Sequence, residues 1–114
     1  MAEDEATRIA YIRRAIDPIR FYPDCSGYFF VYNFAGVNIA HATMKELQGQ
    51  NLNDYTDSRG LYLAREFTKL AQAGGGYLEY YFSKPGETVE SKKLGYVEPI
   101  PNTDYYIGTG VYLE

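Results

Sequence analysis

The sequence predicts an α+β domain: a five-stranded antiparallel sheet with an N-terminal helix and a helical crossover connector on one face. Isoleucines recur at helical spacing near the start, and aromatic and β-branched residues gather in five short runs. An irregular segment with a second helix separates the second run from the third. Because 114 residues support one core, we expect one domain. Residues 1–26 would form its helix and loop, and residues 27–114 its core.

The N-terminal helix is predicted over Glu3 to Asp17, because Pro18 disfavours the helical conformation of the residue before it. Four isoleucines, three or four residues apart, share one face of this helix: Ile9, Ile12, Ile16 and Ile19. This face packs either on the domain's own sheet or on a second copy of the chain. The sequence leaves both options open.

The first two strands form a tight hairpin. Tyr28–Phe34 is rich in aromatic residues, and the short connection Ala35-Gly36 leads into Val37–Ala42. Three more strands are predicted near the C-terminus: Tyr77–Ser83, Lys92–Glu98 and Asp104–Tyr112.

The segment Thr43–Ser58 has few apolar positions and is expected to be an irregular connector, with one helical turn at Lys45–Leu47. A helix follows from Leu61 to Ala71 and ends at three consecutive glycines. The order of one helix, two strands, a helical connector and three strands is that of PAS-like folds.

Several classes of function find no support in the sequence. The formal charge of −4 argues against nucleic acid as a partner. With one histidine, His41, and one cysteine, Cys25, there is no paired-cysteine or metal-ligand pattern, and nothing in the spacing brings these two together as a catalytic pair. We therefore expect no catalytic residues, no metal and no cofactor.

The sequence has no run of eighteen apolar residues, and its start is acidic. As a free-standing protein the chain would therefore be expected in the cytoplasm.

The remaining signal is a binding surface on the sheet. Strand alternation predicts three shared faces, namely Val37 with Ile39 and His41, Tyr28 with Phe30, Tyr32 and Phe34, and Leu78 with Tyr80 and Phe82. Apolar walls with a few phenols and one imidazole, lying under a polar connector, describe a small pocket for an anion or carbonyl. Lys92 or Lys93 would fix a carboxylate there. The alternative for His41 is a core histidine that is hydrogen-bonded to a main-chain carbonyl.

Six short motifs in this region resemble, in the same order, those of the single Cache sensor domains, a PAS-like family. The resemblance covers residues 27–112. Its motifs are Gly27–Asn33, Gly36-Val37 with Ala40-His41, Leu47–Asp54, Gly74–Gly76 with Tyr80–Gly86, Lys93–Val97 and Ile107–Tyr112.

The resemblance implies a non-enzymatic sensor domain of bacterial chemotaxis receptors and sensor histidine kinases, outside the cytoplasmic membrane. Membrane contact would come only through segments absent from this chain. The implied ligands are small carboxylates such as acetate, propionate, pyruvate or lactate. Carried over by position, the ligand-binding residues are Tyr28, Phe30, Tyr32, His41, Tyr80, Lys93 and Tyr96.

One conflict follows from strand alternation, because Lys93 and Tyr96 fall on opposite faces of a regular strand. Either a bulge at Gly95 corrects the alternation, or one of the two side chains lies outside the pocket.

A second function remains open from the sequence, namely a PAS-like interaction module without a small ligand. Its isoleucine helix would form a homodimer and its own side chains would fill the pocket. A third is a small enzyme of the cone-shaped isomerase kind, which needs no motif and finds no positive support in the sequence.

Overall fold

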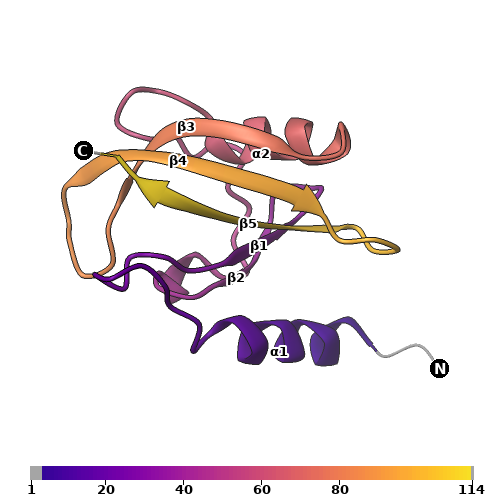
Figure 1. Cartoon of the computed structure of the whole chain (residues 1–114). Coiled ribbons are helices and arrows are strands. Elements are labelled where there is room, and N and C mark those ends of the chain that lie inside the picture. The colour runs from indigo at the N-terminus through magenta and orange to yellow at the C-terminus, as the bar shows by residue number, and fades with distance from the viewer. Residues whose placement is uncertain (1–3, 114) are drawn as a thin grey trace.

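A five-stranded antiparallel sheet forms the middle layer of the protein (Figure 1). The computed structural model describes residues 4–113. The strands are β1 (Phe30–Asn33), β2 (Asn38–His41), β3 (Gly76–Ser83), β4 (Glu90–Pro99) and β5 (Tyr105–Tyr112). Their order across the sheet is β2-β1-β5-β4-β3, so β1 of the hairpin pairs with β5 and β2 is an edge strand. Helices lie on both sides of the sheet, and the predicted α+β class is confirmed.

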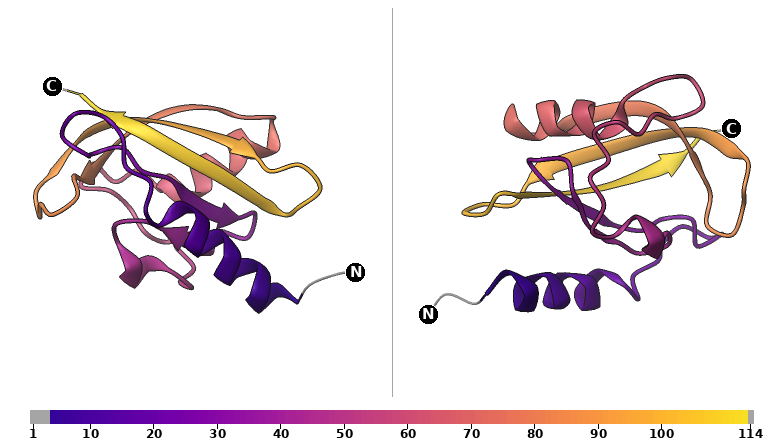
Figure 2. Two further views of the ribbon diagram at one scale, coloured as in Figure 1. Left: turned by 60° about the horizontal axis from the view of Figure 1, so that its bottom comes forward. Right: turned by 180° about the vertical axis from the view of Figure 1, so that it is seen from behind.

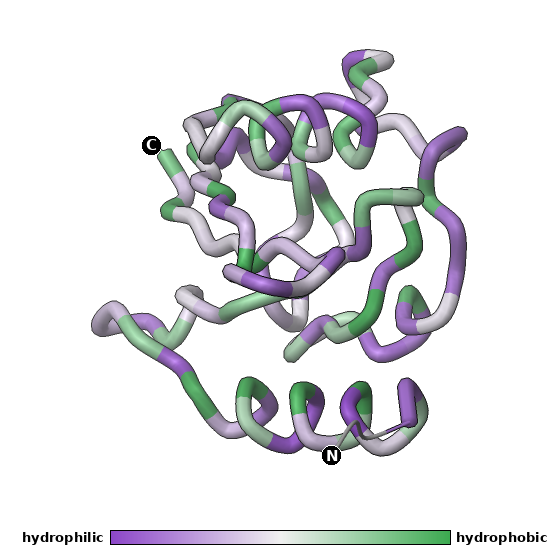
Figure 3. The backbone as a smooth tube through the Cα atoms, turned by 90° about the vertical axis from the view of Figure 1, so that its right-hand side faces the viewer, coloured by the Kyte–Doolittle hydropathy of each residue, from purple (hydrophilic) through white to green (hydrophobic). Residues whose placement is uncertain are grey.

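Helix α1 (Glu5–Ile16) covers the lower face of the sheet in Figure 1. The Asp4 carboxylate accepts a hydrogen bond from the Thr7 amide at 2.8 Å and caps its first turn. Ile16 is buried, and the hydrophobic turns of α1 face the rest of the chain in Figure 3. Ile9 and Ile12 pack on the same apolar cluster of the sheet, so this isoleucine face is used within the domain. Ile19 lies beyond the helix and is 39% exposed, and Glu3 lies outside the described residues.

Strand β1 is shorter than the predicted run Tyr28–Phe34. The Thr109 hydroxyl donates a hydrogen bond to the Tyr28 carbonyl at 2.8 Å, and this side-chain bond stands in place of a main-chain one. The predicted tight hairpin is confirmed. Its turn is held by the Asn33 side-chain oxygen, which accepts from the amides of Ala35 and Val37, both at 3.0 Å.

Strand β2 contains a β-bulge that the sequence did not reveal. Tyr32 pairs with Asn38 and Val31 with Ala40, so Ile39 is an extra residue on β2. Ile39 and Ala40 both pack in the cluster under α1, whereas His41 lies on the opposite face. The predicted common face holds for Val37 and Ile39, but the placement of His41 on it is wrong, because the bulge reverses the alternation after Ile39.

The connector (residues 43–62) crosses the other face of the sheet and leads into α2 (Leu63–Gln72) (Figure 2). Its one helical turn, η1 (Lys45–Leu47), lies where it was predicted. The main core fills the space between the connector, α2 and the sheet, and the predicted faces Tyr28 to Phe34 and Leu78 to Phe82 both contribute to it.

Hydrogen bonds fasten the connector to both edges of the sheet. At β2, the amide of Asn38 donates to the Gln50 carbonyl at 2.9 Å, and the Gly49 amide donates to the Asn38 carbonyl at 2.7 Å. At β3, the buried carboxylate of Asp57 accepts from the Tyr81 amide at 2.9 Å. The other Asp57 oxygen accepts from the amides of Arg59 and Leu61 within the connector. The connector is therefore held in place over this face of the sheet, and it forms the roof of the space beneath it.

Candidate ligand-binding site

A small cavity lies between the sheet and its roof. The space that a water-sized sphere can occupy in it is about 10 Å³, room for about one water molecule. A ligand of a few heavy atoms therefore requires the lining side chains to move apart. Its walls come from β1, β2, α2, β3 and the residues before β1: Tyr28, Phe30, Tyr32, His41, Leu63, Phe67, Tyr80 and Phe82.

Lys93 of β4 is 1% exposed, and its ammonium lies against four of the rings that line this cavity. Its ammonium donates a hydrogen bond to the Tyr28 hydroxyl at 3.0 Å. Five rings surround it at 4.2–5.8 Å from Nζ to the ring centre: Tyr28, Phe30, Tyr80, Phe82 and Tyr112. No carboxylate of residues 4–113 forms a salt bridge with it. Burial lowers the pKa of Lys93 to about 7.

Two glycines make room for this arrangement. Gly95 and Gly110 lie opposite each other on β4 and β5. A Cβ at Gly110 would lie 2.9 Å from Lys93 Cε, and one at Gly95 would lie 2.8 Å from the Tyr80 ring. The motif glycines therefore permit the lysine stem and the tyrosine ring to lie flat on the sheet.

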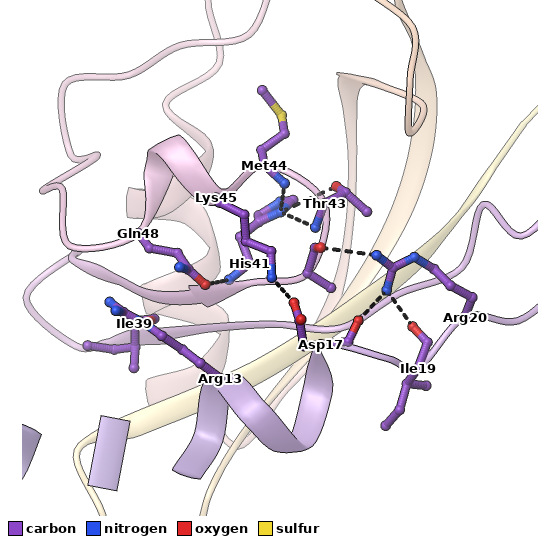
Figure 4. A network of polar contacts seen from close by, with 11 residues as sticks. Arg13, Asp17, Ile19, Arg20, Ile39, His41, Thr43, Met44, Lys45 and Gln48 are labelled. Atoms are coloured by element: carbon purple, nitrogen blue, oxygen red, sulfur yellow. Dashed lines mark hydrogen bonds and ion pairs between the residues drawn. The ribbon is translucent and has the colours of Figure 1, made fainter. Parts of the chain in front are cut away.

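His41 presents a fixed, uncharged ring to the cavity. Its Nδ1 accepts the Met44 amide at 2.9 Å and the Thr43 amide at 3.3 Å (Figure 4). The proton of the neutral ring must therefore reside on Nε2, which becomes a donor. Burial, followed by the charges of Lys93 and Arg20, lowers the pKa of His41 to about 3. The expected alternative, a bond to a main-chain carbonyl, is replaced by bonds from main-chain amides that leave Nε2 for a ligand.

The tyrosines of the cavity remain protonated at neutral pH. Burial raises the pKa of Tyr28 to about 12, and it also raises the pKa values of Tyr32 and Tyr80. Their hydroxyls are therefore neutral groups that can donate hydrogen bonds to an anion.

Five of the seven sequence-predicted site residues line the cavity, namely Tyr28, Phe30, Tyr32, His41 and Tyr80. Lys93 contacts the rings of these lining residues, and Tyr96 lies elsewhere. The pairing of β4 with β3 and β5 is regular through Gly95, so there is no bulge at this residue. Tyr96 consequently lies on the other face, where its ring centre is 4.8 Å from that of Tyr77 and its hydroxyl donates to Glu98 at 3.0 Å. The parity conflict is resolved by placing Tyr96 outside the cavity.

Three further lining residues were not predicted as part of the site. Leu63 and Phe67 come from α2, and Phe82 comes from β3. Phe67 and Phe82 had been expected on apolar faces, but strand and helix periodicity do not tell where two such faces meet. Within the described part of the chain, no cluster of His, Cys, Asp or Glu could hold a metal ion.

Comparison with known proteins identifies the family. The family model of the Cache domain matches residues 2–114. The chain belongs to the Cache family of sensor domains. This Cache domain is 35% identical, over 99% of its length, to the sensor histidine kinase MctS of Rhizobium johnstonii. It spans 24% of that relative, about a quarter of its length.

Two solved structures share the fold of this Cache domain. One is a periplasmic sensor domain of a chemotaxis protein, with a TM-score of 0.87 and 33% identity; the match covers 100% of this chain and 77% of the other. The second is a Cache chemosensory domain described for its carboxylic acid recognition, with a TM-score of 0.89 and 26% identity, covering 98% and 76%. The described helices of the present Cache domain are all too short or too polar to span a membrane.

Proposed function

We propose that this Cache domain is the non-enzymatic, periplasmic sensor module of a chemotaxis receptor or sensor histidine kinase. It binds a small monocarboxylate, such as acetate, propionate, pyruvate or lactate, between the sheet and the connector. The observation that carries this proposal is the buried ammonium of Lys93, which has no carboxylate partner among residues 4–113. Leaving such a charge unpaired costs several kcal/mol, and a bound anion would offset that cost.

Polar and apolar side chains both line the cavity. In the proposed complex, Lys93 and the Nε2 proton of His41 hold the carboxylate, while Tyr28 and Tyr80 donate to its remaining lone pairs. Phe30, Tyr32, Leu63, Phe67 and Phe82 enclose the alkyl part. The solved neighbour described for carboxylic acid recognition supports this ligand class.

The lining also predicts which acids are rejected. Among residues 4–113 no acidic side chain lines the cavity, so the ammonium of an amino acid would have no carboxylate partner there. Burying that charge unpaired is costly, whereas a methyl group in its place is not and a neutral hydroxyl costs far less. We therefore expect monocarboxylates to bind and amino acids to be excluded.

Thermal unfolding with propionate and L-alanine tests this expectation with two ligands that differ by one amino group. Propionate at 100 times its Kd should add about 2.7 kcal/mol to the free energy of unfolding. L-Alanine should leave the unfolding midpoint unchanged at the same concentration. Equal stabilisation by both would contradict the proposed specificity. The absence of a shift with every C2–C4 acid at millimolar concentration would rule out the carboxylate ligand itself.

The alternative of an interaction module is less well supported. The isoleucine face that it assigns to a homodimer is used by the domain's own sheet. A homodimer through α1 would have to use the opposite, solvent-facing side of this helix, which carries Tyr11.

A further inference from the structure

The β-bulge in β2 determines whether His41 reaches the cavity. With regular alternation, His41 would lie on the same face as Ile39, under α1. The extra residue instead leaves Ile39 and Ala40 together under α1 and turns His41 toward Phe30 and the cavity. A shift of one residue in this register would move the imidazole to the other side of the sheet.

Arginines of α1 and the turn after it hold the carbonyls on both sides of His41. Arg13 Nε donates to the carbonyl of the extra residue, Ile39, at 2.8 Å. Arg20 Nη2 donates to the Ala42 carbonyl at 3.0 Å. A bulge interrupts the main-chain ladder, so these side chains replace partners that a regular strand would have. Figure 4 shows both guanidinium groups reaching β2 from the α1 side.

The same network includes the connector. Arg20 Nη1 also donates to the carbonyls of Asp17 and Ile19, at 2.9 and 2.8 Å, at the end of α1. The Asp17 carboxylate forms an ion pair with Lys45 of η1, one residue after the amide that binds His41 Nδ1. The Gln48 side-chain oxygen accepts the main-chain amide of His41 at 3.0 Å. Helix α1, the turn after it and the connector thus hold the main chain and ring of His41 from outside the cavity (Figure 4).

From this geometry we infer that α1 is a working part of the ligand site. Arg13 and Arg20 are positioning residues that keep the bulged register of β2, and with it the imidazole of His41, ready for the ligand. Coupling between two sites is reciprocal, so a ligand that holds His41 also stabilises the docking of α1 on the sheet. The identity of the ligand in this inference rests on the proposed function, but the positioning of His41 does not.

The test compares Arg13→Gln with Arg14→Gln, which removes the same charge from the neighbouring, exposed position. In the absence of ligand, imidazole nitrogen shifts report the hydrogen bond of His41 Nδ1, and hydrogen exchange reports the protection of the Met44 amide. Arg13→Gln should change both, lower the protection of Met44 at least about tenfold, and weaken propionate binding about 5- to 20-fold. Arg14→Gln should match the wild type in the nitrogen shifts of His41, the protection of the Met44 amide and the affinity for propionate. Arg13→Lys, which keeps a donor, should recover part of the loss.

The effect of the ligand on the docking of α1 is measured on the wild type. Saturating propionate should slow hydrogen exchange in α1, over residues 9–16. The inference is overturned if folded Arg13→Gln keeps the wild-type nitrogen shifts of His41 and the wild-type protection of the Met44 amide. It is also overturned if bound propionate leaves hydrogen exchange in α1 unchanged. If Arg13→Gln does not fold, Arg13→Lys and Arg20→Lys decide by the same readouts. Failure of the wild type to bind propionate refutes the proposed ligand alone, because the ligand-free readouts of His41 still test the positioning role.

Discussion

Replacing Lys93 with methionine should strongly weaken carboxylate binding and, in the same variant, stabilise the unliganded domain. The ammonium of Lys93 is buried among rings and, within the described part of the chain, donates a hydrogen bond only to the Tyr28 hydroxyl. Methionine keeps the length and apolar character of the stem without the charge. Removing one partner of a buried charge pair costs about 2–5 kcal/mol of binding, so propionate affinity should fall at least about 30-fold.

The gain in stability follows from the pKa of Lys93, which is about 7 in the folded protein and has an ordinary value of 10.5. Between these values the unfolded chain binds more protons than the folded one, so folding of the wild type is penalised there. The penalty shrinks as the pH rises through this window, by about 1.4 kcal/mol per pH unit. Lys93→Met should therefore exceed the wild type by roughly 2–4 kcal/mol near pH 7.5, and the difference should decline toward pH 10.

Calorimetry with propionate and chemical unfolding at several pH values measure the two effects. Lys92→Met is the matched control, because Lys92 is the neighbouring residue and its side chain is half-exposed beside Glu79. The control should bind propionate like the wild type and show no pH-dependent gain in stability. A Lys93→Met variant that still binds propionate with wild-type affinity would exclude this lysine from the site.

Propionate affinity should fall as the pH rises above about 7. A small carboxylic acid is ionised above about pH 5, but the unliganded domain loses the Lys93 charge near pH 7. Binding above that pH requires proton uptake, which lowers the affinity toward tenfold per pH unit until the pKa of the complex is reached. Between pH 7 and 9 the expected loss is about 50-fold.

The groups that face Lys93 leave it as the titrating residue in this range. The pKa of His41 is lowered to about 3, so its ring is neutral throughout. Burial raises the pKa values of Tyr28, Tyr80 and Tyr112, so their hydroxyls stay protonated. Calorimetry at pH 8 in two buffers of different ionisation enthalpy should show nearly one proton taken up per propionate. An affinity that is constant from pH 6 to 9 would contradict this account.

Much of the fold was predictable because its signals are local. The spacing of Ile9, Ile12 and Ile16 and the position of Pro18 define α1. The aromatic strands and the turn at Lys45–Leu47 are likewise local patterns. Five of the seven predicted site residues line the cavity, and Lys93 contacts their rings, because strand alternation holds along β1, β3 and β4.

What escaped prediction depends on contacts between distant segments. The bulge at Ile39 has no local signature, and it is held by Arg13 and Arg20 from outside the sheet. Tyr96 was assigned to the site by motif position, and its placement outside the cavity needed the register of β4. Asp57 read as one polar residue of an irregular segment, yet its carboxylate fastens the roof to β3.

A crystal structure of the domain with propionate tests the central claim most directly. The account predicts a carboxylate oxygen within about 3 Å of Lys93 Nζ, the second oxygen in reach of His41 Nε2, and the ethyl group between Phe67 and Phe82. Propionate bound elsewhere on the domain, or bound in the cavity with its carboxylate turned away from Lys93, would contradict it.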